Sequence, residues 1–423
     1  MSNRRKKIAI IGSGISGIHT AFRAQENFET LLVEKDDRLG GHTSTFVIPS
    51  GPESGLAIDT GFIVFNEPNY PRFRKFLSDL RVDSDESDMS FSFFSESSDL
   101  EYCGSGLDGL FAQRKRLFDF AHWKMIYEII RFKDLAEKFL SEISLHHLSI
   151  DELISRWGLS HRFKHAYLLP MACSIWSSDQ KEILKFPAIQ MIRFFKNHFL
   201  LEISNRPIWR FVKGGSHSYL KAFRAQFKGE IILGNAAQKI IRHPDQVEIQ
   251  LKDGRKLEVD YVVIAAHADQ TLNLLENPTE KEITQFQCWS YSDNHTILHT
   301  DERLMPPNKK VWSSWNYREI KDHSKSPQLI LSYWMNRLQK LDSKTNYIVS
   351  LNCKPLIDAQ KIVAEFFYTH PIYTSKSLAS QTEIQKLQGL NRTFYCGAYL
   401  GNGFHEDGVK SSEAVLRCLS EMT

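Results

Sequence analysis

Three glycines near the N-terminus are spaced for a tight turn between a strand and a helix. The apolar run 8–11 precedes the turn, whose sequence is Gly12-Ser13-Gly14-Ile15-Ser16-Gly17. In such a turn Gly12 permits the bend, Gly14 lets the backbone approach a phosphate, and Gly17 lets the helix and the strand pack closely. The amide groups that begin the helix then face negative charge, so the turn predicts a diphosphate site.

A second strand and an acid complete the same unit. The run 30–33 ends on Glu34, 22 residues after Gly12, where a carboxylate can accept hydrogen bonds from an adenosine ribose. Lys35 follows directly, and we expect it beside the same ligand. A glycine turn without a ligand is the alternative, but it would need neither the second strand nor the acid. The β-α-β unit therefore predicts an adenine dinucleotide.

The residues after Glu34 favour FAD over NAD. Arg38, Gly40 and Gly41 offer a cation and a second close approach of backbone to the diphosphate, an extension that NAD-only domains lack. The stretch resembles the E-x-x-x-R-x-G-G signature of the flavin-containing amine oxidase superfamily, which includes polyamine oxidases, protoporphyrinogen oxidases and phytoene desaturases. The resemblance implies that the acid binds ribose and that the arginine and the glycines lie along the diphosphate. Most relatives have arginine after the glycine pair, whereas this chain has His42, whose role stays open.

Residues 57–65 provide the next match. Gly61 would let backbone lie close to a planar ring, and Phe62 would shield that ring from water. In the superfamily a D-x-G segment, here Asp59, Thr60 and Gly61, passes along the flavin ring and the ribityl chain. A short core strand followed by a turn is the alternative.

Two later strands and the C-terminal segment extend the resemblance. In relatives a backbone position on the first of these strands, matched here by Ala237, recognises adenine. The second strand, matched by 261–266, packs beside FAD in relatives, and a terminal strand, loop and helix close the site. The N-terminus of that helix would stabilise the negative charge of a reduced flavin. The residues that these matches assign to the cofactor are Ala237, Ala265, Gly397, Gly408 and Val409.

A narrower resemblance is to a bacterial group of FAD-dependent oxidoreductases found with cyclopropane-fatty-acyl synthases. Five marks of that group begin at Gly12, Asp59, Asp88, Gly104 and Tyr395. They read GSGISG, DTGFIVFNExxYP, DMSFS, GSGLxGLFAQR and YCGAYxGxGFHEDG. At least one branch desaturates methylated fatty acyl chains in furan fatty acid synthesis, which implies a lipid substrate.

The matches predict an α/β fold, with a Rossmann-like FAD-binding domain of the glutathione-reductase type and an interleaved α+β substrate domain. Because the matches lie near both ends and in the middle, we expect the FAD domain to be built from three segments. The expected segments are 1–67 (FAD-binding), 68–210 (mostly helical substrate cap), 211–275 (FAD-binding), 276–388 (substrate-domain sheet) and 389–423 (FAD-binding).

Two segments of the expected cap, 111–140 and 193–201, combine aromatic and basic side chains. The first is predicted to be an amphipathic helix. Its apolar residues at helical spacing are Trp123, Ile126, Tyr127 and Ile130. This composition predicts a membrane-surface patch that admits an acyl chain. A helical cap with a solvated basic face is the alternative.

The expected chemistry is hydride transfer from a substrate carbon to flavin N5 in an apolar cleft, helped by an acid or a base. The polar residues expected near the ring as catalytic candidates are His405, Lys213 and Tyr399, with His42 and Glu406 besides. Three functions stay open: desaturation of a methylated fatty acyl chain of a phospholipid, amine oxidation, and a non-catalytic flavoprotein partner of a fatty-acyl methyltransferase. Cys396 stands in a motif unlike that of covalent amine oxidases, so we expect non-covalent FAD.

Composition suggests no further cofactor. The 423 residues carry a net charge of +3, too small to indicate nucleic acid. Six scattered cysteines favour a reducing compartment over disulfides or zinc, and His161 and His165 lack an evident third metal ligand. Neither a secretory signal nor a membrane-spanning segment is predicted. We therefore expect a cytoplasmic protein, peripheral at the inner face of the membrane if its basic-aromatic helices meet lipid, and make no prediction of oligomeric state.

Overall fold

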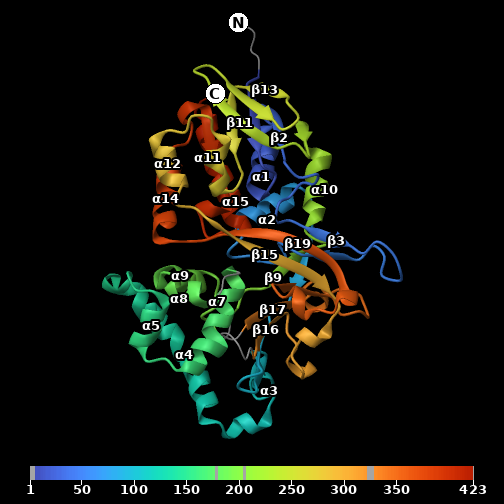
Figure 1. Ribbon diagram of the computed structural model, residues 1–423, viewed down its shortest axis with the longest axis vertical. Helices are drawn as coiled ribbons and strands as arrows, with labels where there is room; N and C mark the ends of the chain where they lie inside the picture. The colour runs from blue at the N-terminus through green and yellow to red at the C-terminus, as the bar shows by residue number, and fades with distance from the viewer. Residues whose placement is uncertain (1–4, 177–179, 203–205, 322–327, 423) are drawn as a thin grey trace.

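The computed structural model describes residues 5–176, 180–202, 206–321 and 328–422. The chain forms two regions along its long axis, and both termini lie in the same one (Figure 1). We call them the parallel-sheet region and the mixed-sheet region, after the sheet at the centre of each. The chain passes between them several times, because strands far apart in the sequence share one sheet.

The parallel-sheet region contains five parallel strands in the order β10-β2-β1-β14-β20. Their apolar runs are buried because other elements cover both faces of the sheet. Ile8 and Ile10 pack on one face, whereas Ala9 and Ile11 pack on the other. The strands are β1 (Lys7–Ile11), β2 (Glu29–Val33), β10 (Glu230–Ile232), β14 (Tyr261–Ile264) and β20 (Thr393–Tyr395).

Helices cover the first face, and a small antiparallel sheet with short helices covers the second. The elements on the first face are α1 (Ile15–Ala24), α2 (Pro71–Asp79), α10 (His217–Gln226) and α15 (His405–Ser420). The elements on the second face are β11 (Ala237–Arg242), β12 (Val247–Leu251), β13 (Lys256–Val259), α11 (Thr271–Leu274), α12 (Glu280–Phe286) and α14 (Ser375–Gln385). α1 and α15 pack against each other, so the two ends of the chain meet in this region.

The mixed-sheet region contains seven strands in the order β19-β15-β18-β17-β16-β7-β8. β16 and β7 run parallel, and the other neighbours run antiparallel. The strands are β7 (Phe91–Ser95), β8 (Leu100–Cys103), β15 (Tyr291–His299), β16 (Trp315–Ile320), β17 (Gln328–Trp334), β18 (Ile348–Leu351) and β19 (Ile362–Pro371). The sheet therefore combines two N-terminal strands with five that follow residue 290.

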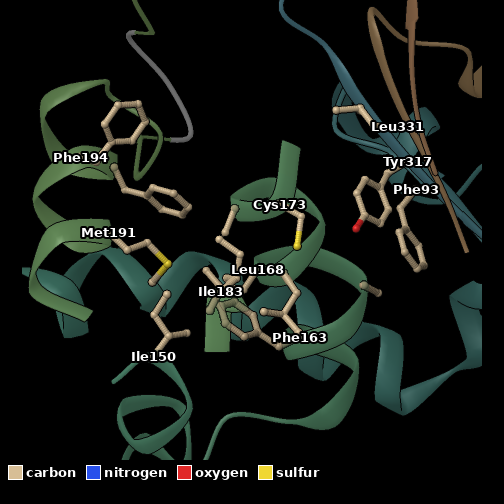
Figure 2. Close-up of a cluster of buried hydrophobic side chains, with 14 of the residues drawn as sticks. Phe93, Ile150, Phe163, Leu168, Cys173, Ile183, Met191, Phe194, Tyr317 and Leu331 are labelled. Carbon is tan, nitrogen blue, oxygen red and sulfur yellow. The ribbon is translucent and has the colours of Figure 1, made fainter. Parts of the chain in front are cut away.

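A layer of helices packs against this sheet. Figure 2 shows Met191 and Phe194 of α9 on the helical side of the shared apolar cluster. Leu168 lies in its middle, and Phe93 and Tyr317 reach it from the strands. The helices are α3 (Gly106–Leu110), α4 (Phe120–Ser141), α5 (Ile150–Trp157), α6 (His161–Phe163), α7 (Leu169–Trp176), α8 (Gln180–Lys185) and α9 (Ala188–Asn197).

Short strands and one short helix join the two regions. β3 and β4 form a two-stranded sheet, and β9 lies between β5 and β6 in a three-stranded sheet. The bounds are β3 (Thr45–Val47), β4 (Ala57–Asp59), β5 (Phe65–Asn66), β6 (Ser84–Ser87), β9 (Trp209–Val212) and α13 (Met335–Leu338).

The helix expected over 111–140 begins only at Phe120. Asp119 caps it, since its carboxylate accepts hydrogen bonds from the first amides of α4, and the 3-10 segment η1 (Arg114–Phe118) precedes it. The buried stripe also differs from the expected apolar set, because the buried side chains of α4 include Met125 and Phe132. Among the described residues, no helix combines the length and apolar content needed to cross a bilayer.

Two expected segment boundaries differ from the packing. α2 was expected in the cap, but Phe73 and Phe76 fill the core of the parallel-sheet region, where α2 packs on α15. Likewise α12 and α14, expected with the substrate sheet, contribute Phe286 and Ile384 to the opposite face of the parallel sheet. Buried apolar side chains thus assign these helices to a region that sequence order does not reveal.

Candidate active site

One cavity of about 640 Å³ extends from the carboxyl ends of the parallel strands into the mixed-sheet region. Its first half is lined by the glycine turn after β1, by residues 34–36, 38 and 40–42 after β2, and by Ala265 after β14. This edge of a parallel sheet is where dinucleotides bind, because helix N-termini and strand ends converge there. We call this half the dinucleotide half and the remainder the substrate half.

The first glycine turn leaves space only where a ligand would need it. Gly12 has φ +104°, and a Cβ there would lie 2.9 Å from the Ala265 carbonyl oxygen. A Cβ on Gly17 would overlap the Gly12 carbonyl oxygen. By contrast, a Cβ on Gly14 would meet nothing within 4 Å, although Gly14 lines the cavity with Ile15 and Ser16. Gly12 and Gly17 therefore serve packing, and Gly14 keeps open the room that a diphosphate requires.

Glu34 is held at the wall of this half. Its carboxylate is buried and accepts hydrogen bonds from the Ser13 amide at 2.8 Å and the Ser13 hydroxyl at 2.6 Å. The Asp36 amide donates to it at 3.1 Å. These bonds orient the acid toward the turn, and Lys35 lines the cavity beside it. The carboxylate stands where an adenosine ribose would lie in a β-α-β dinucleotide site.

The second glycine pair meets the first turn. A Cβ on Gly41 would lie 3.4 Å from the Gly14 Cα, so the two turns are neighbours along the cavity wall. The Arg38 guanidinium donates to the carbonyl oxygens of Thr43 at 3.1 Å and Gly41 at 2.8 Å. Arg38 thus fixes the loop that carries Gly40 and also lines the cavity.

His42 carries a buried nitrogen with no hydrogen-bond partner. Its Nε2 is shielded from solvent and unpaired among the described residues, and its ring lies 5.1 Å from that of His370, 5.4 Å from Tyr368 and 6.1 Å from His267. Burial lowers the pKa of His42 to about 4, so its ring is neutral at pH 7. An orphaned nitrogen in the cavity wall fits a ligand that carries both hydrogen-bond donors and acceptors, as FAD does.

The segment after β4 lies along the cavity, but Asp59 does not. Thr60, Gly61 and Phe62 line the cavity, and the Phe62 amide donates to the His42 carbonyl oxygen at 2.8 Å. The buried Asp59 carboxylate instead accepts bonds from the Ser216 amide at 2.8 Å and from Gln339 Nε2 at 2.9 Å. Burial raises its pKa to about 7. The expected cofactor contact by this side chain is therefore corrected: strand alternation points Asp59 into a junction of β4, α10 and α13.

The residues expected at the cofactor in the C-terminal segment also separate into some that line the cavity and some that are buried in the core. Gly397 and Tyr399 line the cavity, as does Ala237. Gly408 and Val409 are absent from the lining: a Cβ on Gly408 would lie 2.6 Å from Ile15 Cγ2, and Val409 is fully buried in the core. These two residues make the contact between α15 and α1.

His405 and Tyr399 lie in the cavity wall, but neither is placed as a base. His405 stacks on Phe62 with ring centroids 3.6 Å apart, and its Nε2 is bonded to Thr43 Oγ1 at 3.1 Å and Tyr219 Oη at 3.3 Å. Burial lowers the pKa of His405 to about 3, so its ring is neutral at pH 7, and the contacts to Thr43 and Tyr219 occupy its Nε2. The Tyr399 hydroxyl has no partner among the described residues, and burial raises its pKa, so it keeps its proton.

The other polar candidates point elsewhere. Lys213 is exposed and lies on a separate depression, lined also by Lys340. Glu406 accepts hydrogen bonds from the amides of Arg72 at 3.1 Å and Phe73 at 3.0 Å, so it caps α2. Their positions outside the cavity lining do not suit acid–base work on its contents.

The substrate half is lined by side chains to which the sequence patterns assigned no individual role. They come from α7 and α9, from four strands of the mixed sheet, from β9, and from the segments before β5, β7 and β9. The apolar and aromatic members are Ile63, Val64, Met89, Phe91, Met171, Ile175, Phe194, Leu200, Trp209, Trp315, Tyr333 and Leu351. His198 and Arg206, from the segment between α9 and β9, also line this half. In the sequence, Ile63 and Val64 belong to the 57–65 match, Met89 and Phe91 to the mark that begins at Asp88, and Phe194 and Leu200 to the segment 193–201.

The family model of flavin-containing amine oxidoreductases matches residues 15–346. The chain belongs to this family. A curated relative, the FAD-dependent oxidoreductase dbaF of Emericella nidulans, is 34% identical over 91 residues, which are 21% of this chain and 18% of that protein. The matched stretch therefore covers less than a fifth of that relative.

Solved structures share the fold over nearly the whole chain. A redesigned putrescine oxidase aligns with TM-score 0.69 and 12% identity, covering 98% of this chain and 99% of that one. Cyclohexylamine oxidase from Brevibacterium oxydans aligns with TM-score 0.69 and 12% identity, covering 99% and 100%. A CLA-producing fatty acid isomerase from P. acnes aligns with TM-score 0.64 and 14% identity, covering 97% and 98%.

The family member described here is an FAD-dependent oxidoreductase with FAD as its cofactor. The predicted α/β fold, with a Rossmann-like FAD domain and an interleaved substrate domain, is confirmed. The narrower resemblance to the group found with cyclopropane-fatty-acyl synthases stays a prediction. His161 and His165 stack with centroids 4.2 Å apart, and no set of three or more metal-ligating side chains occurs within the described ranges.

Proposed function

We propose that this FAD-dependent oxidoreductase desaturates a fatty acyl chain, and that a methylated acyl chain of a phospholipid is its substrate. The lining of the substrate half carries the proposal. Among the described lining residues of that half, apolar and aromatic side chains predominate, and Arg206 is the one side chain with a permanent charge. A saturated chain offers only apolar surface, which such a lining can bury.

The same lining disfavours a polyamine. Cationic substrates are bound by carboxylates and by aromatic rings around the ammonium group. The carboxylates in the described lining, Glu34 and Asp36, lie in the dinucleotide half. The rings of Trp209, Trp315 and Tyr333 keep oxidation of a small amine as the second candidate, because aromatic faces alone can hold one cation.

The chain's own groups would bind and shield the reactants. Bound FAD would accept a hydride at N5 from an acyl carbon, and a later acceptor would reoxidise it. The two glycine turns and Glu34 hold the dinucleotide, and the Phe62–His405 stack forms a rigid wall of the cavity. The apolar substrate half excludes water from the acyl chain.

Desaturation also releases a proton from the neighbouring carbon, and His198 is the histidine best arranged to receive it. Its Nδ1 lies 3.0 Å from the Phe194 carbonyl oxygen and donates to it, so the neutral ring keeps its lone pair on Nε2. The ring lines the cavity between Phe194 and Phe404. Burial lowers the pKa of His198 to about 4, which keeps that lone pair unprotonated at pH 7.

We also propose that FAD is held without a covalent bond. Cys396 is buried beside Thr20 and absent from the cavity lining, and burial raises the pKa of its thiol to about 12. A protonated thiol turned away from the cavity is a poor nucleophile toward a flavin. Acid precipitation should leave the flavin in the supernatant; flavin in the pellet would contradict this arrangement.

Anaerobic mixing of the purified holoenzyme with candidate substrates tests the proposed reaction. Methylated phospholipid should bleach the oxidised flavin absorbance, and mass spectrometry should show a product two hydrogens lighter. Unmethylated phospholipid of equal chain length is the matched control for the methyl group. Bleaching by putrescine or cyclohexylamine but not by lipid would overturn the proposal. Absence of bleaching by every candidate, with binding to a fatty-acyl methyltransferase, would instead favour the accessory role.

A further inference from the structure

An exposed apolar surface covers the end of the mixed-sheet region farthest from the termini, where α3 and the start of α4 lie (Figure 1). Phe118 is 87% exposed and Phe120 is 91% exposed, on either side of the helix cap. We call this surface the apolar tip, and its members are Leu107, Leu117, Phe118, Phe120, Trp123, Tyr127 and Ile130. Such a concentration of exposed apolar side chains indicates a binding surface.

The tip is held in place by polar contacts beneath it. The Asp119 carboxylate accepts hydrogen bonds from Arg116 at 2.9 Å and Arg162 at 2.8 Å while it caps α4. These two cations hold the pKa of Asp119 down, at about 2. Trp123 Nε1 donates to the Leu117 carbonyl oxygen at 2.9 Å. Phe118 and Phe120, the neighbours of Asp119, are therefore carried outward by an ordered scaffold.

The exposed stripe of α4 is separate from the stripe that makes the core. Met125, Phe132 and Phe139 point inward and are buried, whereas Tyr127 and Ile130 remain 61% and 55% exposed. One helix thus has two apolar faces, of which folding uses one. The inner face packs on α9, and Phe194 of α9 lines the substrate half of the cavity.

Cations border the tip. Lys124 and Arg131 share the exposed face of α4, and the one carboxylate between residues 120 and 131, Glu128, is buried. Arg114 and Lys115 precede the helix and form exposed ion pairs with Asp108 and Asp99. Exposed pairs of this kind contribute little, so their cations stay available to other anions. Aromatic rings bordered by lysine and arginine suit the interface of an anionic bilayer.

We propose that the apolar tip docks the enzyme on an anionic lipid bilayer, with Phe118 and Phe120 inserted at the level of the headgroups. The bordering cations then meet lipid phosphates. A protruding tip suits a deformable bilayer better than a flat protein face, because each exposed ring can be surrounded by acyl chains. Docking is a property separate from acyl-chain oxidation, so either can fail alone.

Sedimentation of the FAD-loaded full-length protein with vesicles tests this surface. Vesicles of phosphatidylglycerol and phosphatidylcholine should bind it more tightly than phosphatidylcholine alone, and added salt should weaken the binding. The double variant Phe118→Ser, Phe120→Ser should lower the partition coefficient about a hundredfold, about tenfold for each ring. The matched control is Ile283→Ser with Leu390→Ser, which removes two apolar side chains, 40% and 49% exposed, from the parallel-sheet region.

Each result of the vesicle sedimentation supports or overturns the proposal that the apolar tip binds lipid. Both variants should keep their flavin absorbance and melting temperature, because the replaced side chains are exposed, and only the tip variant should lose vesicle binding. Equal binding by wild type and tip variant, or no binding of wild type to anionic vesicles, would overturn the proposal. Sedimentation velocity tests the alternative that the tip binds a second copy of the chain. If the wild type is a dimer and the tip variant is a monomer with unchanged vesicle binding, the tip is a dimer interface and not a lipid-binding surface.

Discussion

The two halves of the cavity are built in opposite ways. The dinucleotide half relies on backbone: glycines that leave room, amides at the start of α1, and loops that directly follow β1 and β2. The substrate half relies on side chains that reach the cavity from helices and strands hundreds of residues apart, such as Phe91 and Leu351. A backbone site demands glycine at set spacings and is therefore legible in a sequence. A side-chain site demands only volume and polarity, which many sequences satisfy.

Buried histidines, most of them in the two halves of the cavity, make the stability of the folded protein depend on pH. Burial lowers the pKa of seven histidines, five of them in the cavity lining, to about 3 or 4: His19, His42, His198, His267, His299, His370 and His405. Between pH 6.5 and 4 the unfolded chain binds more protons than the folded one, so stability is lost as the pH falls. Asp59 and Asp407, whose pKa values are raised to about 7 and about 6, offset part of this loss.

Denaturant titrations of the apoprotein should show the unfolding free energy falling by about 10 kcal/mol from pH 7 to pH 5. The holoprotein should lose less, because a diphosphate beside His42 would favour the charged ring. A stability that is flat or rises on acidification would mean that these rings are not buried as neutral groups.

Two glycines of one turn separate packing from ligand space. Gly17→Ala places a methyl group against the Gly12 carbonyl oxygen and should cost about 3 kcal/mol of stability, with loss of bound flavin. Gly14→Ala is the matched control, because a Cβ there meets no atom within 4 Å. It should fold normally and bind FAD more weakly. Flavin content and denaturant unfolding measure both effects; equal destabilisation by the two variants would contradict this division.

His198→Asn tests the substrate half without touching the dinucleotide half. The amide keeps a donor for the Phe194 carbonyl oxygen but offers no basic nitrogen, so the rate of anaerobic flavin reduction should fall about a hundredfold. FAD affinity should stay unchanged, and so should the substrate concentration that half-saturates the reduction. The variant should also lose the acidic limb of the pH–rate profile. Unchanged reduction kinetics would remove His198 from the mechanism.

His42 tests the dinucleotide half in the same manner. His42→Ala removes the orphaned Nε2 and should weaken FAD binding about tenfold, whereas His42→Gln places an amide near the position of that nitrogen and should recover part of the loss. Calorimetric titration of apoprotein with FAD measures both. If alanine and glutamine weaken binding equally, the ring contributes by packing alone.

The smallest expected effect is that of replacing Trp315, in the substrate half, on the KM for substrate. Its ring lies edge-on to Tyr333 at 4.9 Å, and its buried Nε1 has no partner among the described residues. Trp315→Phe keeps an aromatic ring and removes the donor, so KM for an acyl ester should rise about fivefold with kcat nearly unchanged. A hydrocarbon chain without an ester should bind both proteins equally. An equal loss for both ligands would show that ring volume, and not the N–H group, is used.

The elements that the residue patterns predicted around the dinucleotide half are present in the fold. The β1–α1–β2 unit, the glycine pair at 40–41, the position of Ala265 and the terminal strand and helix lie where the sequence placed them. Asp59 was misplaced because a strand directs adjacent side chains to opposite sides, and the cavity lies on the side of Thr60. α4 was given too early a start because the η1 segment has helix-like composition, and the cap at Asp119 outweighs it.

The sequence by itself determined the cofactor and the fold class, because close approach of backbone to a diphosphate permits only glycine at a few fixed spacings. Tertiary structure decided which surfaces face substrate and which face solvent. Trp123 belongs to the apolar stripe predicted from the sequence and Met125 does not, yet packing against α6 and α9 buries Met125 and leaves Trp123 exposed on the apolar tip. The reason is physical: periodicity marks that a helix has apolar faces, but only its neighbours determine which face is covered.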